Sequence, residues 1–180
     1  MRQEGRTMKN IYLGIGSSLG KREENLYRAI NYIAELIGPP EAISSIYETE
    51  PWGFRSDDLF LNIVAKVESQ LPPHELLEAT MLIERKMGRV RGDDKYSSRN
   101  IDIDILLMDN HLVNEPDLVI PHPRMHLRKF VLLPLNELSN DIFHPVLKKN
   151  AKTLLEECKD ESMIRKFTDR NQINPLSAKL

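Results

Sequence analysis

The chain has 180 residues and a formal net charge of −2, so it can bury a full apolar core in one domain, and its charge alone does not indicate a nucleic acid or an anionic membrane as a partner. Its only cysteine, Cys158, excludes an intrachain disulfide and fits a reducing compartment such as the cytoplasm. No apolar run approaches the ~20 residues that a membrane-spanning helix needs.

Residues 1–8 are polar, lack the apolar centre of a signal peptide, and are expected to form a disordered extension. The apolar pattern begins at Ile11, and residues 11–15 are predicted to form a short buried strand that ends in a Gly-rich turn at 14–20. A helix ending at Gly38 follows. Its apolar stripe consists of Leu26, Ala29, Ile30, Ile33, Ala34 and Ile37.

The next segments predict two strands and a second helix. Residues 42–47 read as a strand and 50–58 as a loop. Residues 59–68 alternate, so that Phe60 and Asn62 share the face opposite Leu61 and Ile63. Pro72-Pro73 opens a helix that ends at Gly88. Its stripe consists of Leu76, Thr80, Ile83 and Met87.

A charged loop over 89–100 leads into an alternating strand over 101–108. We expect a turn at 109–110, a short strand at 111–113, and short helices around 128–138 and 151–158. The order β-α-β-β-α-β predicts an α+β fold of the ferredoxin-like, split βαβ type, with a mainly antiparallel sheet and helices packed on it. We expect a single domain over 9–159, followed by a mobile polar extension at 160–180.

Two carboxylates give the clearest chemical signal. In the segment 101–105, alternation buries the isoleucines and puts Asp102 and Asp104 on the opposite face, ~7 Å apart along the strand. Like charges this close repel unless a cation lies between them, and Mg²⁺ commonly uses one or two carboxylates with phosphate oxygens. A half-exposed strand with a solvated polar face would show the same alternation.

The loop directly upstream is cationic. It carries Arg89, Arg91, Lys95 and Arg99 within eleven residues. Guanidinium groups match phosphate geometry, and a mobile loop of this kind can close over a polyphosphate. An ordinary charged surface loop is the alternative, and its acids at 93 and 94 favour that reading, but its position next to the Asp pair favours phosphate binding.

Three further segments attract attention. The glycines at 14, 16 and 20 resemble a dinucleotide-binding pattern but miss its spacing and also miss a Walker lysine, so a tight turn between strand and helix explains them better. Phe60 and Asn62 could stack on a heterocycle and read its edge, although a buried Phe and a backbone-bonded Asn are the commoner arrangement. The segment 121–130 gathers His122, Arg128 and Phe130, and imidazole can bind phosphate or transfer protons.

Taken together, these segments resemble the 6-hydroxymethyl-7,8-dihydropterin pyrophosphokinase family from about Ile11 to Leu138. The resemblance is carried by 14–17, Tyr47 with 49–53, 60–62, Glu84 with 88–91, Arg99 with 101–104, and 121–124 with Phe130. The family usually has Asn at the position of Ser18 and reads Gly-Pro-Arg-Thr where this chain has 97–100, which puts loop dynamics and affinities in question rather than the reaction.

The resemblance implies an αβα sandwich that transfers pyrophosphate from ATP to a pterin hydroxymethyl group, releasing AMP, in folate synthesis. It implies two Mg²⁺ ions on Asp102 and Asp104. The implied catalytic residues are Arg89, Arg91, Arg99, Asp102 and Asp104. The implied ATP-binding residues are Glu84, Arg89, Arg91, Lys95, Tyr96, Arg99, His122 and Arg128. The implied pterin-binding residues are Thr49, Pro51, Trp52, Phe60, Asn62 and Phe130.

Two points stay open. The general base could be His122, or a Mg²⁺-activated hydroxyl could need no dedicated base. A phosphotransferase or nucleotidyltransferase could use the same Asp pair, and an RNA-binding module could use the same sheet type, although near-neutral charge argues against RNA. We expect a cytoplasmic monomer whose partners are the small molecules ATP and pterin, with no nucleic acid and no membrane.

Overall fold

The structure is a computed structural model that describes residues 7–53, 56–88 and 99–169. The elements of these ranges are, in chain order, β1 (Lys9–Ser17), α1 (Arg22–Leu36), β2 (Pro40–Ile43), β3 (Ile46–Thr49), β4 (Phe60–Ser69), α2 (Pro73–Lys86), β5 (Asp102–Met108), β6 (Val113–Asn114), β7 (Val119–Ile120), the 3-10 helix η1 (Met125–Leu127), α3 (Lys129–Leu138), β8 (Phe143–His144), β9 (Lys149–Asn150), α4 (Ala151–Glu157) and β10 (Ile164–Thr168).

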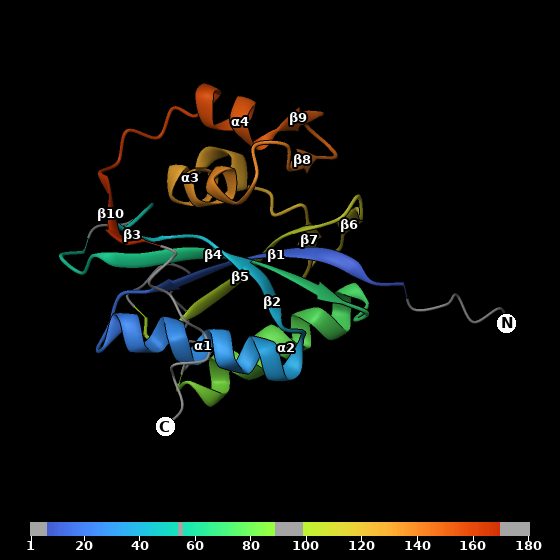
Figure 1. Ribbon diagram of the computed structural model, residues 1–180, viewed down its shortest axis with the longest axis horizontal. Coiled ribbons are helices and arrows are strands. Elements are labelled where there is room, and N and C mark those ends of the chain that lie inside the picture. The colour runs from blue at the N-terminus through green and yellow to red at the C-terminus, as the bar shows by residue number, and fades with distance from the viewer. Residues whose placement is uncertain (1–6, 54–55, 89–98, 170–180) are drawn as a thin grey trace, which may run out of the picture.

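The main sheet is antiparallel at every recorded pairing and runs in the order β10-β3-β4-β1-β5, with β2 also pairing with β4. The first strand therefore lies between β4 and β5, as the split βαβ order requires. Figure 1 shows α1 and α2 on one face of the sheet and α3 and α4 over the other. The predicted fold class and three-layer arrangement are confirmed.

Side-chain alternation on the strands builds a core on each face of the sheet. Ile11, Leu13 and Ile15 of β1 and Ile63 of β4 pack with the stripes of α1 and α2. Val64 belongs to the other face, where it joins a second cluster of Leu106, Met125, Val131 and Leu135 around α3. Phe60 and Asn62 share the face of Val64, because residues two apart on a strand point the same way. The end of β4 that α3 leaves uncovered therefore presents them to a cavity.

Several predicted bounds differ from the structure. The predicted strand 42–47 is two strands, β2 and β3. β1 continues to Ser17, so the glycines at 14 and 16 lie inside a strand, and only Gly20, at φ +63°, belongs to the turn. The strand expected at 111–113 begins only at Val113. Ala34 is exposed and is not part of the apolar stripe of α1, because it lies on the side of the helix next to the buried face.

Residues 160–180 were predicted to form a mobile extension, but in the described part of that range the chain returns to the sheet, while residues 1–6 and 170–180 of the predicted extensions lie outside the described residues. Residues 164–168 form β10, which pairs antiparallel with β3. β10 is an edge strand, and most of its side chains face solvent. It therefore tolerates charged residues, and its sequence does not show the apolar alternation that predicts a strand. Among the described residues, no helix is long and apolar enough to cross a membrane.

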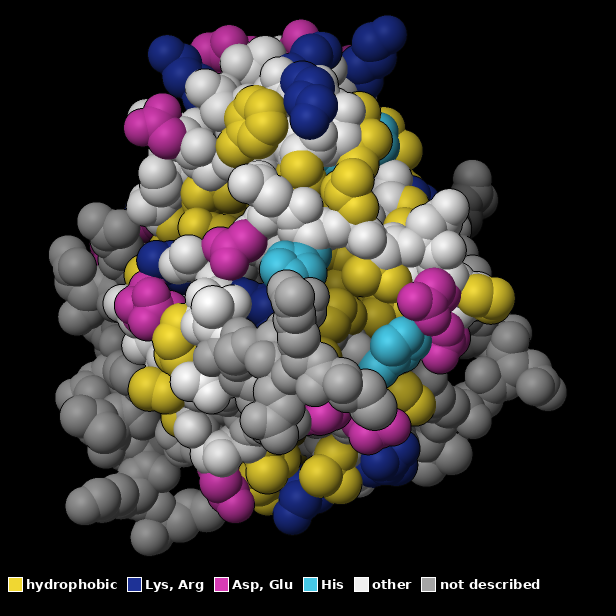
Figure 2. All heavy atoms as spheres, turned by 90° about the vertical axis from the view of Figure 1, so that its right-hand side faces the viewer, with side chains coloured by type: hydrophobic (Ala, Val, Ile, Leu, Met, Phe, Trp, Pro, Cys, Tyr) yellow, Lys and Arg dark blue, Asp and Glu magenta, His cyan; other side chains and the backbone are white. Residues whose placement is uncertain are grey.

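Figure 2 shows the face of the molecule that carries the β6–β7 and β8–β9 hairpins, where apolar side chains gather beside histidines. Leu112, Phe143 and Val146 are exposed there. A hollow of about 420 Å³ between the two hairpins is lined by these apolar segments and by three histidines, at 122, 126 and 144. His122 also lines a second cavity, over the main sheet.

Candidate active site

A cavity of about 270 Å³ lies over the sheet at the end that α3 leaves open, and its floor is set by strand register. Gly16 of β1 pairs with Asn62 on one side and Asp102 on the other, and Gly14 pairs with Val64 and Asp104 in the same way. Two rows of residues thus cross three strands with a glycine in the middle. The missing side chains leave open floor between an amide on β4 and a carboxylate on β5.

Gly16 is required for the position of the Asn62 amide. A Cβ at residue 16 would lie 2.8 Å from Asn62 Oδ1, which is closer than carbon and oxygen can approach. Asn62 Nδ2 donates to Thr49 Oγ1 at 2.8 Å, and both residues are buried. The amide is therefore held from β3 and β4, with its oxygen directed along the floor. With Phe60 and Phe130 it forms what we call the aromatic wall, to which Thr49 and Trp52 also contribute.

The opposite side, which we call the charged wall, consists of Asp102, Asp104, Arg99, His122 and Arg128. Arg99 Nη1 lies 3.0 Å from Asp102 Oδ1, and Arg128 Nη1 lies 3.2 Å from Asp104 Oδ2. Despite these cations, burial and the neighbouring Asp102 raise the pKa of Asp104 to about 7. A further cation beside these two neighbouring carboxylates would favour their ionised form, as the sequence predicts for a cation site.

Arg99 is fixed by the β1–α1 turn. The backbone N–H groups of Ser18 and Leu19 donate to the Arg99 carbonyl at 3.0 and 3.2 Å, and the Arg99 N–H donates to Ser18 Oγ at 2.9 Å. Ser17 Oγ donates to the Asn100 carbonyl at 2.6 Å. The hydroxyl at Ser18, where the family usually has an amide, therefore has a definite use here.

Arg128 connects the two walls. Its guanidinium carbon lies 4.8 Å from the centre of the Trp52 ring and 5.6 Å from that of Phe130, while Nη1 contacts Asp104. The side chain is buried, and its Nε has no hydrogen-bond partner among the described residues. A buried donor without a partner is costly, and this one is shielded from the cavity as the side chain stands.

His122 presents an N–H to the same space. Burial and the nearby Arg128 lower its pKa to about 4, so the imidazole is neutral at pH 7. Its Nδ1 accepts from the Arg124 backbone N–H at 3.1 Å, which leaves the ring proton on Nε2, 3.8 Å from Asp104 Oδ2. A neutral imidazole in this tautomer is a hydrogen-bond donor toward the cavity.

The comparisons with known proteins agree with this geometry. The family model for 7,8-dihydro-6-hydroxymethylpterin-pyrophosphokinase matches residues 12–140. The chain belongs to this family. Enzymes of the family pyrophosphorylate hydroxymethyldihydropterin with ATP as co-substrate in folate biosynthesis, and the chain is an enzyme of that class, with ATP and a pterin as small-molecule substrates.

The 2-amino-4-hydroxy-6-hydroxymethyldihydropteridine pyrophosphokinase of Aquifex aeolicus is 36% identical over 160 residues, covering 89% of this chain and 96% of that protein. The enzyme of the same name from Bacillus subtilis is 39% identical, covering 75% and 81%. A crystal structure of a Plasmodium falciparum HPPK-DHPS variant matches with a TM-score of 0.70 at 17% identity, which shows the fold. That match covers 86% of this chain and 45% of the Plasmodium one.

Most of the residues predicted for the pyrophosphokinase site lie together in the cavity. These are Thr49, Trp52, Phe60, Asn62, Arg99, Asp102, Asp104, His122, Arg128 and Phe130. Pro51 is not among the lining residues, and neither is Glu84, which is buried below the floor and accepts from the Ile103 backbone N–H at 2.9 Å. Arg89, Arg91, Lys95 and Tyr96 lie outside the described residues.

Sequence reasoning missed the floor itself. Gly14 and Gly16 were read as a turn, although their spacing of two on an alternating strand was the signal for a shared face. Glu50 and Arg124 also line the cavity and were not singled out. Trp52 is half-buried against Arg128, because a guanidinium stacks well on an aromatic face.

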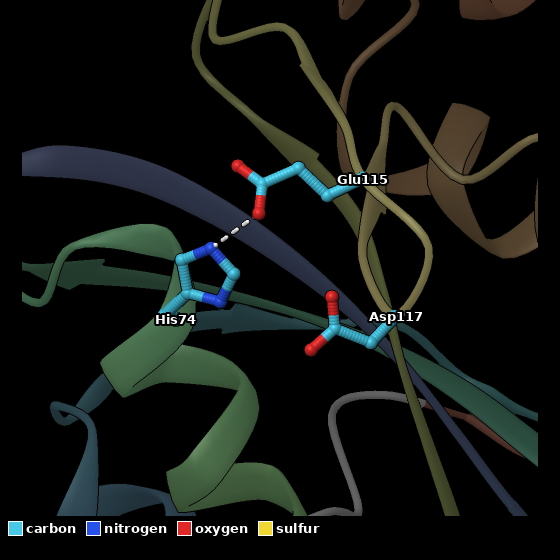
Figure 3. Close-up of side chains that lie close together, drawn as sticks. All are labelled: His74, Glu115 and Asp117. Atoms are coloured by element: carbon cyan, nitrogen blue, oxygen red, sulfur yellow. Dashed lines mark hydrogen bonds and ion pairs between the residues drawn. The ribbon is translucent and has the colours of Figure 1, made fainter.

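A second group of metal-capable side chains lies on the surface. Figure 3 shows His74 at the start of α2 facing Glu115 and Asp117 from the β6–β7 turn. His74 Nε2 lies 2.9 Å from Glu115 Oε2, and both side chains are about half exposed. An exposed pair of this kind contributes little to the stability of the fold and is screened by salt. It serves to fasten the turn, closed by the mutual hydrogen bonds of Glu115 and Leu118, to α2.

Proposed function

We propose that the cavity is the pyrophosphoryl-transfer site, with the triphosphate of ATP on the charged wall and the pterin on the aromatic wall. The observation that carries this proposal is the row Asn62–Gly16–Asp102. Two strand spacings separate its ends by ~10 Å. That span suits a flat heterocycle whose edge is read at Asn62 while its hydroxymethyl group reaches a phosphate near Asp102.

We further propose that Asp102 and Asp104 hold two Mg²⁺ ions. The carboxylates fit such a site, because Asp102 and Asp104 lie together in the cavity lining, burial and Asp102 raise the pKa of Asp104, and Mg²⁺ prefers carboxylate oxygens beside phosphate. When bound, the ions would neutralise the triphosphate and polarise its oxygens. The guanidinium of Arg128, which lines the cavity beside Asp104, supports an anion at the same place.

The chain's own groups then have distinct tasks. Phe60 and Phe130 stack on the two faces of the pterin, and Asn62, steadied by Thr49, reads its edge. His122 Nε2–H, Arg128 and Arg99 donate to phosphate oxygens and hold the β-phosphorus in line with the hydroxymethyl oxygen, so that AMP leaves. Since the His122 proton is on Nε2 and its Nδ1 accepts from Arg124, the residue acts as a donor rather than as the general base, and the hydroxymethyl proton passes to water without a dedicated protein base.

Arg89, Arg91, Lys95 and Tyr96, with Pro51 and Glu84, are proposed from the family resemblance alone to complete the ATP and pterin sites. The free Cys158 supports a cytoplasmic enzyme. We propose that it acts as a monomer, since every group named for the reaction belongs to one chain.

The first test resolves the nucleotide products after incubation with ATP, Mg²⁺ and hydroxymethyldihydropterin. AMP as the product supports pyrophosphoryl transfer, whereas ADP indicates phosphoryl transfer and pyrophosphate indicates nucleotidyl transfer. The second test assigns the walls by calorimetric titration. Phe60→Ala, Asn62→Ala and Phe130→Ala should each weaken pterin binding about tenfold or more, with affinity for a non-hydrolysable ATP analogue little changed. Phe143→Ala, at an exposed Phe far from the cavity, is the matched control.

A further inference from the structure

The segment after α4 crosses from one helical layer to the edge of the sheet. We call residues 158–168 the C-terminal strap. In Figure 1 it descends from α4 and ends as β10 beside β3. The family model ends at residue 140, so the strap lies outside the part of the chain that the family match covers. Its contacts nevertheless fall on elements that carry the aromatic wall.

At its upper end the strap caps α3. Asp160 Oδ2 accepts from the backbone N–H of Lys129, the first residue of α3, at 2.9 Å. Asp160 Oδ1 accepts from the N–H and hydroxyl of Ser162 at 3.0 and 2.6 Å, which fixes the carboxylate. The helix has no side-chain cap of its own, because its N-cap residue is Arg128, whose side chain points to Asp104.

Capping of this kind bears directly on the cavity. A helix start leaves its first N–H groups without partners, and a carboxylate there satisfies one of them and suits the positive end of the helix. Burial works against ionisation, but the bonds from Ser162 and Lys129 outweigh it and lower the pKa of Asp160. The residues on either side of the capped Lys129 are Arg128, which joins the two walls, and Phe130, which forms one face of the pterin slot.

At its lower end the strap holds the other side of the slot. Ile164 pairs with Thr49 on β3, and the Met163 N–H donates to Glu50 Oε2 at 3.3 Å. Arg165 forms an ion pair with Glu48, which is buried and also bound by Arg22 Nη2 at 2.9 Å. These contacts lie at the end of β3, directly before Trp52.

The first residues of the strap lie across a second cavity from Trp52. This cavity of about 590 Å³ has Trp52 on one side and Cys158, Lys159 and Asp160 on another. Trp52 also lines the candidate active site, so its ring separates the two spaces. The strap therefore contacts α3 and β3 directly, and it acts on Trp52 through the end of β3, since a cavity lies between the strap and the Trp52 ring.

We propose that the C-terminal strap sets the width of the pterin slot, with Asp160 as a positioning residue that acts through the start of α3. The strap ties Phe130 on one side and the Thr49–Trp52 segment on the other to a single stretch of chain. This inference rests on the proposed function, because it takes the aromatic wall to be the pterin slot. It assigns a role in substrate affinity to residues that touch neither substrate.

A ligand-free measurement tests the strap by itself. Trp52 is the only tryptophan in the chain, so intrinsic fluorescence reports its surroundings alone. We expect Asp160→Ala and Arg165→Ala each to raise the acrylamide quenching constant of Trp52 about twofold. The matched control is Glu161→Ala, which removes the same charge one residue along from an exposed position, and should leave quenching unchanged. Unchanged quenching in both strap variants would overturn the proposal, whatever the ligand in the slot.

Calorimetry with hydroxymethyldihydropterin and with an ATP analogue tests the consequence. Asp160→Ala should weaken pterin binding about five- to tenfold and change nucleotide binding less than twofold, while Asp160→Asn, which keeps an acceptor, recovers most of the loss. If Asp160→Ala does not fold, Ser162→Ala, which only frees the carboxylate, should give a smaller loss of the same kind. Equal losses for both ligands, or pterin affinity that does not move, would refute the role. If Phe60→Ala also leaves pterin affinity unchanged, the slot assignment itself is at fault.

Discussion

The charged wall of the cavity takes both carboxylates from one strand, whereas the aromatic wall draws Thr49, Asn62 and Phe130 from three elements. The charged wall holds two neighbouring carboxylates, and burial and the charge of Asp102 raise the pKa of Asp104. The aromatic wall is satisfied internally, since Asn62 already bonds Thr49. We infer that the charged wall, whose carboxylates a bound cation would stabilise, serves the chemistry. The aromatic wall, whose amide is already held in place before a ligand binds, serves recognition.

The strongest way to break this comparison is to remove a carboxylate. We expect Asp102→Ala and Asp104→Ala each to lower turnover by about 10³-fold or more, because losing a metal-holding group costs several kcal/mol and each ~1.4 kcal/mol is tenfold in rate. Circular dichroism should show an intact fold. Asp141→Ala, at an exposed position, is the control. Turnover near wild type in both variants would remove the metal assignment.

The aromatic wall is tested most sharply through its floor. In Gly16→Ala the new Cβ would meet Asn62 Oδ1 at 2.8 Å, so the amide must move away from its place beside Thr49. We expect pterin affinity to fall about tenfold, with nucleotide affinity changed far less. Gly14→Ala is the comparison, because its Cβ would meet only the apolar Leu106 side chain at 3.4 Å, which can shift. Equal effects on pterin binding would mean that the amide is not what Gly16 protects.

The smallest effect is on stability and sharpens the description of the charged wall. Since the pKa of Asp104 is raised from 3.8 to about 7, the folded metal-free protein keeps a proton between those pH values that the unfolded chain has lost. The free energy of unfolding should therefore fall as the pH rises from about 4 to about 7.

Asp104→Asn removes this dependence. With a chelator present, the variant should match wild type near pH 4 and exceed it by about 1–2 kcal/mol at pH 8, because partial contact with solvent reduces the full effect. Urea denaturation across the pH range measures this. A stability difference that stays constant with pH would show that Asp104 does not titrate there.

The sequence revealed the charged wall because an alternating run of isoleucines fixes which way Asp102 and Asp104 point. The same alternation placed Phe60 and Asn62 on one face. Alternation within one strand cannot show that Gly16 lies between Asn62 and Asp102. That arrangement depends on the pairing register of three strands, and no single strand specifies its register with the others. Glycines near a strand end also suggest a turn, so the sequence does not indicate that Gly14 and Gly16 form the floor of the cavity. β10 was missed since an edge strand needs few apolar residues.

The pairing of β10 with β3 also bears on how the protein avoids self-association. Without β10, β3 would expose a row of backbone N–H and C=O groups along the sheet's margin, where another unfolded or identical chain could add as a strand. β10 takes the place of β3 at the edge of the described sheet, and its Arg165 and Lys166 put charge at that edge. The strand thus covers the backbone groups of β3, so a protease cut in residues 158–163 that releases β10 would promote aggregation.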